Sequence, residues 1–314
     1  MRVIVTGAVG FIGHSVCHRL LCDGHTVYGV DSINDYYDPL IKLDRLRDLQ
    51  GFHNFFFLQE NLAESFPTAI SSSKIDAVIH LAAQAGVRYS LTNPKAYIQS
   101  NVVGFQNVID FVASKKIPKF IYASSSSVYG NSPCPETGWS EDVECLPSNL
   151  YGATKKANEL VAAAYCETDK INAIGLRFFS VYGPNGRPDM FLTSAIAKAK
   201  LGQPITLFCD DGDDMLRDWT HISDITAGII LSLESCLTGH HVFNLAAANP
   251  VSVVKTAVKI KEHFQSDGLL LAAGRQAGEI SFTRGNIDKA KNILGYFPLI
   301  PFQDGLAQLL AAEN

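Results

Sequence analysis

A tyrosine and a lysine four residues apart, Tyr151 and Lys155, are the side chains in this sequence best suited to move a proton. They lie in NLYGATKKANEL, residues 149–160, a segment compatible with a helix, so this spacing puts both on one helix face. A phenol with a pKa of about 10 is a poor base at neutral pH, but a nearby cation favours the phenolate. The pair can then take a proton from a hydroxyl while hydride leaves the same carbon. The string YASSSSVYG, residues 122–130, adds hydroxyls, and we expect Ser125 or a neighbour to hydrogen-bond the reacting group.

A glycine-rich segment near the N-terminus supplies a second chemical signal. Gly7, Gly10 and Gly13 form a G-x-x-G-x-x-G pattern between an apolar run and a segment with helical periodicity. Glycines at these places allow a tight turn and the close approach of a pyrophosphate, while the helix N-terminus supplies N–H groups and a positive dipole. Asp31 ends the next expected strand, where its carboxylate can accept hydrogen bonds from ribose hydroxyls and would repel a 2′-phosphate. The pattern therefore predicts a dinucleotide site that prefers NAD to NADP.

Short apolar runs that alternate with amphipathic segments must position these side chains. We expect strands at 2–6, 26–30, 54–58, 76–82, 118–124 and 171–178, and helices at 39–49, 94–114 and 149–168. This alternation is typical of βαβ units, and it predicts an α/β fold with a doubly wound, parallel, Rossmann-type sheet. After residue 180 the rhythm changes, with a Gly- and Pro-rich loop at 183–189, helices at 190–201 and 221–233, and a strand at 241–246. We therefore expect an NAD-binding domain over 1–179, to which 219–247 returns, and a smaller substrate lobe made of 180–218 and 248–314.

Composition and charge exclude several classes of protein. The 314 residues carry 26 Lys and Arg against 31 Asp and Glu, a net charge of −5, and 47% of them are hydrophobic. A mildly acidic chain without a basic block is a poor binder of nucleic acid, and no apolar run reaches the roughly 18–20 residues of a membrane span. Seven scattered cysteines without a C-x-x-C pair indicate free thiols in a reducing cytoplasm, and the histidines lack the partners of a metal site.

Taken together, these segments resemble the extended short-chain dehydrogenase/reductase family of nucleotide-sugar enzymes over nearly the whole chain. Within that family the sequence looks most like the UDP-glucuronate 4-epimerases. The resemblance is carried by TGAVGFIG (6–13), DSINDYYDP (31–39), HLAAQAGVRYSLTNP (80–94), YASSSSVYG (122–130), LYGATKKANEL (150–160), LRFFSVYGPNGRPDM (176–190) and RDWTHISDI (217–225). It implies NAD-dependent 4-epimerisation of a UDP-sugar, UDP-glucuronate to UDP-galacturonate, through a transient 4-keto sugar. It also implies a homodimer formed through the helices at 94–114 and 149–168.

The resemblance assigns roles to individual residues. Tyr151 and Lys155 would be the catalytic pair, and Ser125 would orient the hydroxyl. The implied cofactor contacts are Gly7, Gly10, Phe11, Ile12, Gly13, Asp31, Asn61, Leu62, Leu81, Ala82, Ala83, Asn101, Tyr151 and Lys155. The implied substrate contacts are Arg88, Ser125, Ser126, Ser127, Tyr151, Ser180, Arg187 and Arg217. Arg88 and Arg217 would approach the diphosphate, and Arg187 would bind the sugar carboxylate.

Departures from the family pattern concern mainly the substrate side and keep other functions open. Asn61 replaces a usual acid, Leu216 a frequent arginine, Ser180 a threonine, His221 the tyrosine of Y-I-D-D, and Gln276–Glu279 the string R/Q-P-G-D. Ser126 and Ser127 stand where related dehydratases carry an acid pair and decarboxylases a glutamate. Elimination therefore lacks a proton donor, and reversible oxidation and reduction remain. The alternatives are a UDP-glucose/UDP-galactose 4-epimerase, a UDP-glucuronate decarboxylase, and a non-catalytic NAD-binding regulatory protein.

Overall fold

The computed structural model describes residues 1–314 except 68–69, 71–73, 211, 276–277, 279 and 314. Its largest element is a seven-stranded sheet of order β10-β6-β5-β4-β1-β2-β3 in which every neighbouring pair is parallel. The strands are β1 (Arg2–Thr6), β2 (Thr26–Asp31), β3 (Phe55–Gln59), β4 (Ala77–His80), β5 (Phe120–Ser125), β6 (Ala173–Phe178) and β10 (His240–Leu245). Parallel strands require crossover helices, which cover both faces of the sheet, so its central strands β1, β4 and β5 are almost fully buried.

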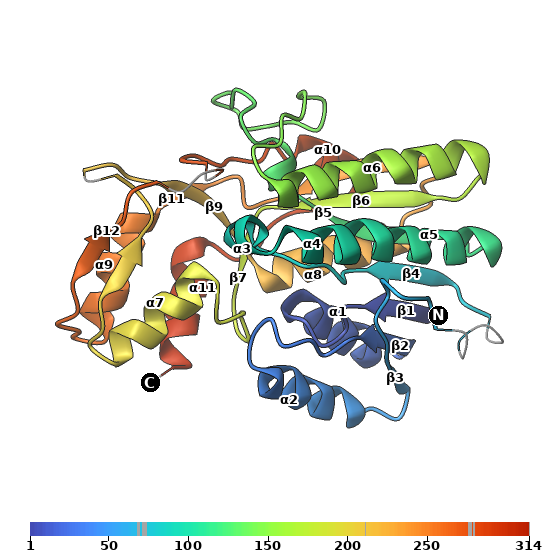
Figure 1. The fold of residues 1–314 in the computed structure, drawn as a ribbon, viewed down its shortest axis with the longest axis horizontal. Coiled ribbons are helices and arrows are strands. Elements are labelled where there is room, and N and C mark those ends of the chain that lie inside the picture. Colours follow the sequence, from blue (N-terminus) through green and yellow to red (C-terminus); the bar gives the residue numbers. More distant parts are fainter. Residues whose placement is uncertain (68–69, 71–73, 211, 276–277, 279, 314) are drawn as a thin grey trace.

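Helices cover the sheet on both faces (Figure 1). They are α1 (Phe11–Cys22), α2 (Pro39–Gln50), α3 (Val87–Thr92), α4 (Pro94–Tyr97), α5 (Gly104–Ser114), α6 (Leu150–Thr168), α8 (Ile222–Glu234) and α10 (Asp288–Leu294). Alternate residues of one strand serve opposite faces: Val3 packs with α1 and α8, while Ile4 packs with α5 and α6. This period of two fixes which helix lies on which side of the sheet.

A smaller lobe, at the left of Figure 1, follows the sheet's C-terminal edge. It holds β7 (Ser180–Tyr182), β9 (Leu216–His221) and β11 (Pro250–Ser252) in one small sheet, and β8 (Ile205–Leu207) paired with β12 (Leu270–Ala272) in another. Helices α7 (Phe191–Lys200), α9 (Val253–His263) and α11 (Phe302–Ala311) pack on them. The apolar cluster around Trp219 and Phe302 forms the core of this lobe.

The predicted fold class, a doubly wound parallel sheet, is confirmed. All six strands expected before residue 180 are present, and the strand expected at 241–246 is β10, at one edge of the large sheet. The helix expected over 94–114 is present without a break, but its middle turn, Ile98–Val103, is π-helical and lies between α4 and α5. Residues 222–245 pack on the large sheet, whereas β9 belongs to the small one. The division of the chain into two domains stays a prediction.

No helix among the described residues is both long and apolar enough to cross a membrane. The same residues contain no group of three or more His, Cys, Asp or Glu side chains arranged to hold a metal ion. All seven cysteines are free thiols.

Candidate active site

Two adjoining cavities lie where the large sheet meets the smaller lobe. The first, of about 420 Å³, is lined by the glycine-rich loop, the ends of β2, β4 and β5, and the start of α6. The second, of about 580 Å³, is lined mainly by α3, by β7 and the loop after it, and by the start of α7, with two residues of β9. They share Tyr36, Gly86, Val87, Ser180, Val181, Arg187 and Met190. Ligands of open α/β sheets bind at this carboxyl edge of the strands, so the cavities are the candidate site.

The glycine-rich loop closes tightly between β1 and α1. Gly7 has a φ of +69°, and a Cβ on Gly13 would lie 1.9 Å from the Gly7 carbonyl oxygen, so neither position has room for a side chain. Helix α1 begins at Phe11 with Gly10 as its N-cap and without a side-chain cap, which leaves N–H groups of its first turn for a ligand. This cradle fits the pyrophosphate of a dinucleotide.

Asp31 lies at the end of β2, beside the loop. Its Oδ1 accepts the N–H of Ile33 at 3.0 Å and its Oδ2 accepts the N–H of Val9 at 3.3 Å. Burial raises the pKa of Asp31, while these N–H groups and the Lys42 charge oppose the rise. Lys42 and Asn34 also line the cavity, and the Lys42 ammonium donates to the Asn34 Oδ1 at 2.5 Å. Sequence reasoning missed both, although Asn34 lies within the DSINDYYDP string.

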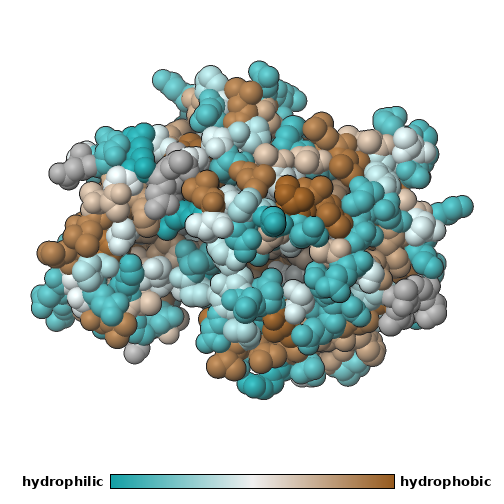
Figure 2. Space-filling view, viewed as in Figure 1, coloured by the Kyte–Doolittle hydropathy of each residue, from teal (hydrophilic) through white to brown (hydrophobic). Residues whose placement is uncertain are grey.

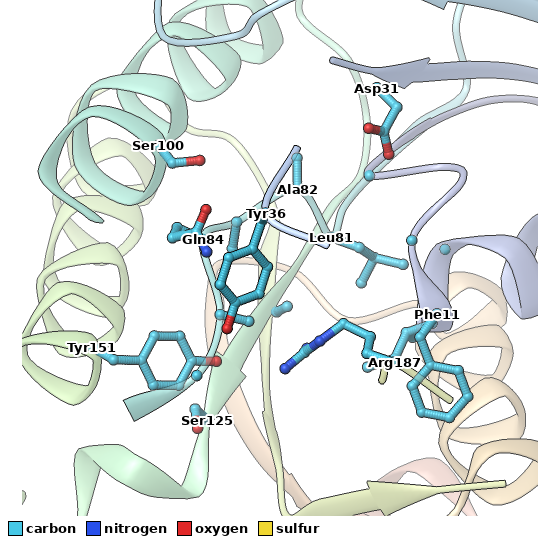
Figure 3. A pocket seen from close by; sticks show the side chains of 18 of the residues that line it. Phe11, Asp31, Tyr36, Leu81, Ala82, Gln84, Ser100, Ser125, Tyr151 and Arg187 are labelled. Carbon is cyan, nitrogen blue, oxygen red and sulfur yellow. The ribbon is translucent and has the colours of Figure 1, made fainter. Parts of the chain in front are cut away.

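Tyr151 and Ser125 meet because α6 begins against the serine-rich turn. A Cβ on Gly152 would lie 2.3 Å from the Ser127 carbonyl oxygen, so the missing side chain allows this close approach. Burial raises the pKa of Tyr151, whereas the hydrogen bond with Ser125 and the charge of Arg187 lower it. Figure 3 shows Tyr151, Ser125 and Arg187 around one cavity, with the guanidinium directed toward the tyrosine side.

Lys155 occupies a different place in this network from the one that the spacing suggested. Its ammonium donates to the Ala123 carbonyl at 2.9 Å, and burial lowers the pKa of Lys155 to about 8. The cation that favours the Tyr151 phenolate here is Arg187. A direct effect of Lys155 on the phenol stays a prediction.

Three arginines border the second cavity. The Arg88 guanidinium lies 3.8 Å from the centre of the Phe208 ring, and Arg217 comes from β9. Arg187 forms a two-pronged ion pair with Asp189, with Nε–Oδ1 and Nη2–Oδ2 distances of 2.9 Å. Arg88 and Arg217 both line the second cavity and can bind a diphosphate there, while Arg187 lines both cavities.

Most of the predicted site residues line these cavities. Every implied cofactor contact except Asn101 lines the first: Gly7, Gly10, Phe11, Ile12, Gly13, Asp31, Asn61, Leu62, Leu81, Ala82, Ala83, Tyr151 and Lys155. Of the implied substrate contacts, Ser125, Tyr151, Ser180 and Arg187 line the first cavity, and Arg88, Ser127, Ser180, Arg187 and Arg217 the second. Ser126 lines neither of them, because it lies in the turn that carries the chain past Ser125.

Asn101 is buried behind the cavity wall rather than in it. Its amide accepts from the backbone N–H of Gln84 at 2.8 Å and donates to the Gln84 carbonyl at 3.0 Å, and it also donates to Thr154 Oγ1 at 3.1 Å. Asn101 therefore fixes the backbone of Gln84, whose side chain does line the cavity. Sequence reasoning missed Gln84 and Tyr36, although both lie in strings that carry the family resemblance.

The departures from the family pattern lie in different places. Asn61 lines the first cavity and donates to Glu64 at 2.9 Å. His221 is buried at the end of β9 and accepts the Ser223 N–H, outside both cavities. Leu216 begins β9, next to Arg217. Gln276 and Glu279 lie outside the described residues, so the structure does not describe that departure.

Comparison with known proteins agrees with this geometry. The pattern of the NAD dependent epimerase/dehydratase family matches residues 3–246. The UDP-glucuronate 4-epimerase of Thermodesulfobacterium geofontis is 36% identical over 307 residues, which cover 96% of this chain and 93% of the relative. UDP-glucuronate 4-epimerase 1 of Arabidopsis thaliana is 37% identical over 330 residues, which cover 99% of this chain and 76% of the relative.

The solved structures give the same result. The crystal structure of the UDP-glucuronic acid 4-epimerase of Bacillus cereus, in complex with UDP-glucuronic acid and NAD, superposes with a TM-score of 0.90. The similarity covers 100% of this chain and 99% of that one, at 30% identity.

Proposed function

Because this chain belongs to the NAD dependent epimerase/dehydratase family, we propose that it is an isomerase that converts UDP-glucuronate to UDP-galacturonate at C4. The observation that carries the choice of a uronate is the Arg187 guanidinium, which faces the same cavity as Tyr151. A planar fork of N–H donors is matched to a carboxylate, and a neutral sugar has no group that needs it. The named relatives act on the same uronate.

NAD, once bound, supplies the hydride acceptor and donor at C4. Tyr151 takes the proton of the 4-hydroxyl and later returns it, and Ser125 holds the reacting oxygen and donates to the phenolate. Arg187 favours the phenolate by its charge. It also holds the substrate carboxylate in the plane of the ring, where loss of CO₂ from the 4-keto sugar is poorly aligned. Ser126 and Ser127 offer no acid to expel a hydroxyl, so the 4-keto sugar turns over within the site and is reduced again on its opposite face.

The homodimer belongs to the same proposal. Apolar surface residues gather over α4 and α6 in Figure 2. Leu160 on α6 is 62% exposed and Ile98, directly after α4, is 42% exposed. Exposed apolar patches on two neighbouring helices support association with a second copy through this face. The free thiols support a reducing compartment such as the cytoplasm.

The test incubates the purified protein with UDP-glucuronate in two parallel reactions, one without added NAD and one with a catalytic trace of NAD. The products of both are then resolved by NMR. We expect UDP-galacturonate to form and NADH not to exceed the amount of enzyme, because each turnover regenerates NAD. Stoichiometric NADH would instead identify a dehydrogenase. Release of CO₂ with a pentose product would identify a decarboxylase, and exclusive turnover of UDP-glucose would identify a neutral-sugar epimerase. Absence of turnover with every UDP-sugar, despite bound NAD, would favour a regulatory protein.

A further inference from the structure

Arg187 is held by Asp189 of its own loop, and Asp189 is in turn held by Tyr36 from a loop that is distant in the chain. Its Nε and Nη2 groups donate to the two carboxylate oxygens of Asp189, and the hydroxyl of Tyr36 donates to Asp189 Oδ2 at 3.1 Å. Tyr36 belongs to the loop after β2, and Asp189 to the loop after β7. The three side chains therefore join the cofactor half of the site to the substrate half.

The ion pair occupies only one edge of the guanidinium. The group has five N–H donors in one plane, and the contacts with Asp189 use the edge formed by Nε and Nη2. Among the described residues, Asp189 is the one that hydrogen-bonds Arg187. The remaining edge carries Nη1, and the guanidinium itself projects into the cavity on the side of Tyr151 (Figure 3). That edge can form a second two-pronged contact with a carboxylate.

Tyr36 is itself fixed by its surroundings. Its ring lies 4.8 Å from that of Tyr89, and a Cβ on Gly86 would lie 3.0 Å from the Tyr36 hydroxyl and 3.7 Å from Asp189 Oδ2. Gly86 has a φ of +98°, which favours glycine, so its backbone leaves room for the hydroxyl and the carboxylate together. The Tyr89 ring and the Gly86 backbone therefore hold the Tyr36 hydroxyl in place against Asp189.

We propose that Asp189, held by Tyr36, is a positioning residue for carboxylate recognition. It fixes the guanidinium of Arg187 so that its second edge meets the carboxylate of a uronic acid. An arginine without this partner would have to give up side-chain freedom on binding, whereas a fixed one has already done so. The inference rests on the proposed function, because it takes a uronate as the ligand.

Electrostatic repulsion by Asp189 acts in the opposite direction. A carboxylate next to the ligand's own carboxylate repels it, and it competes for the same cation. If competition dominated, removal of the Asp189 charge would tighten the binding of a uronate. If positioning dominates, the same change weakens it, so the two effects differ in sign.

The experiment measures nucleotide affinity by calorimetry in a Tyr151→Phe background, with NAD bound, so that the ligand is not turned over. UDP-glucuronate and UDP-glucose are titrated into the parent and into its Asp189→Asn and Tyr36→Phe derivatives. We expect Asp189→Asn to raise the Kd for UDP-glucuronate about tenfold or more, and the Kd for UDP-glucose less than about threefold. Tyr36→Phe should act in the same direction by roughly 2- to 10-fold, because it removes one uncharged donor.

Asp44→Asn is the matched control. Asp44 pairs with Arg47 at 2.7 Å on α2, lines neither of the two cavities, and is exposed. The control should leave both affinities unchanged. Tighter binding of UDP-glucuronate in Asp189→Asn, equal weakening of both nucleotides, or no change would each overturn the positioning role. A parent that binds UDP-glucose as tightly as UDP-glucuronate would instead refute the proposed choice of a uronate, before any Asp189 variant is compared.

Discussion

Replacement of Arg187 by alanine separates an enzyme for uronates from one for neutral sugars. A hydrogen bond to a charged group contributes about 1.5–3 kcal/mol, and each 1.4 kcal/mol corresponds to about tenfold. Loss of one such bond should therefore lower kcat/KM for UDP-glucuronate roughly 10- to 150-fold. The variant also leaves the Asp189 carboxylate facing the substrate's carboxylate without a cation between them, which adds repulsion. UDP-glucose lacks that charge and should be affected far less.

Protein stability is expected to change little in this variant. The side chains of Arg187 and Asp189 are 22% and 32% exposed, so solvent screens part of their attraction, and we expect loss of the pair to change the free energy of unfolding by about 1 kcal/mol. If Arg187 served only to hold its loop, the variant would lose thermal stability and both substrates would suffer alike. Arg187→Lys keeps the charge but lacks the planar fork of donors. Compared with Arg187→Ala, it should therefore recover part of the activity on UDP-glucuronate, but it should orient the substrate carboxylate less well than arginine does.

The assay compares initial rates on UDP-glucuronate and UDP-glucose over a range of pH, with CO₂ measured in parallel. Because the Arg187 charge lowers the pKa of Tyr151, its removal raises that pKa. The rise of activity with pH should therefore occur at a higher pH in the variant than in the wild type, with both substrates. The substrates are therefore compared at each enzyme's own optimum. We expect CO₂ release from the variant, since the carboxylate of the keto acid is no longer held in plane. A wild-type enzyme that prefers UDP-glucose, or a variant that loses both activities equally, would refute the carboxylate role.

Three further predictions concern the cofactor, the base and the fold. Tyr151→Phe should fold and bind NAD but lose roughly 10²- to 10⁴-fold in turnover, and a variant that keeps more than about a tenth of the rate would show that Tyr151 is not the base. Enzyme stripped of cofactor should be activated by NAD and far less by NADP, because Asp31 repels a 2′-phosphate; equal activation by both would contradict that role. Burial raises the pKa of Asp218 from 3.8 to about 6, so its contribution to stability is fully present below pH 3.8 and is lost as pH rises through about 6. This shift of about two pKa units corresponds to roughly 3 kcal/mol. In urea unfolding, the free energy of unfolding of Asp218→Asn relative to the wild type should therefore increase by up to about 3 kcal/mol between pH 4 and pH 7. A difference that does not depend on pH would contradict the assignment.

Local patterns were enough to predict the large sheet and the cofactor loop. The strand at 2–6 and the glycines that follow it depend on neighbouring residues, because a tight turn and a helix start are specified within a few positions. The motifs around Tyr151 and Ser125 were enough to predict that both residues belong to the site, and both line the first cavity. The short strands of the smaller lobe, such as β7 and β11, were not predicted, since three residues carry too little periodicity and their pairing partners are distant in the chain.

The amino-acid sequence by itself determined the fold class, the glycine cradle, the acid at the end of β2 and the family resemblance, because each is written in contiguous residues. Only the tertiary structure decided that Asn101 supports Gln84 from behind the cavity and that Ser126 lines neither cavity. It also decided the link between Tyr36 and Asp189, which are 153 residues apart. Such contacts depend on how loops at the ends of different strands converge after the sheet has formed, and no local spacing encodes that convergence.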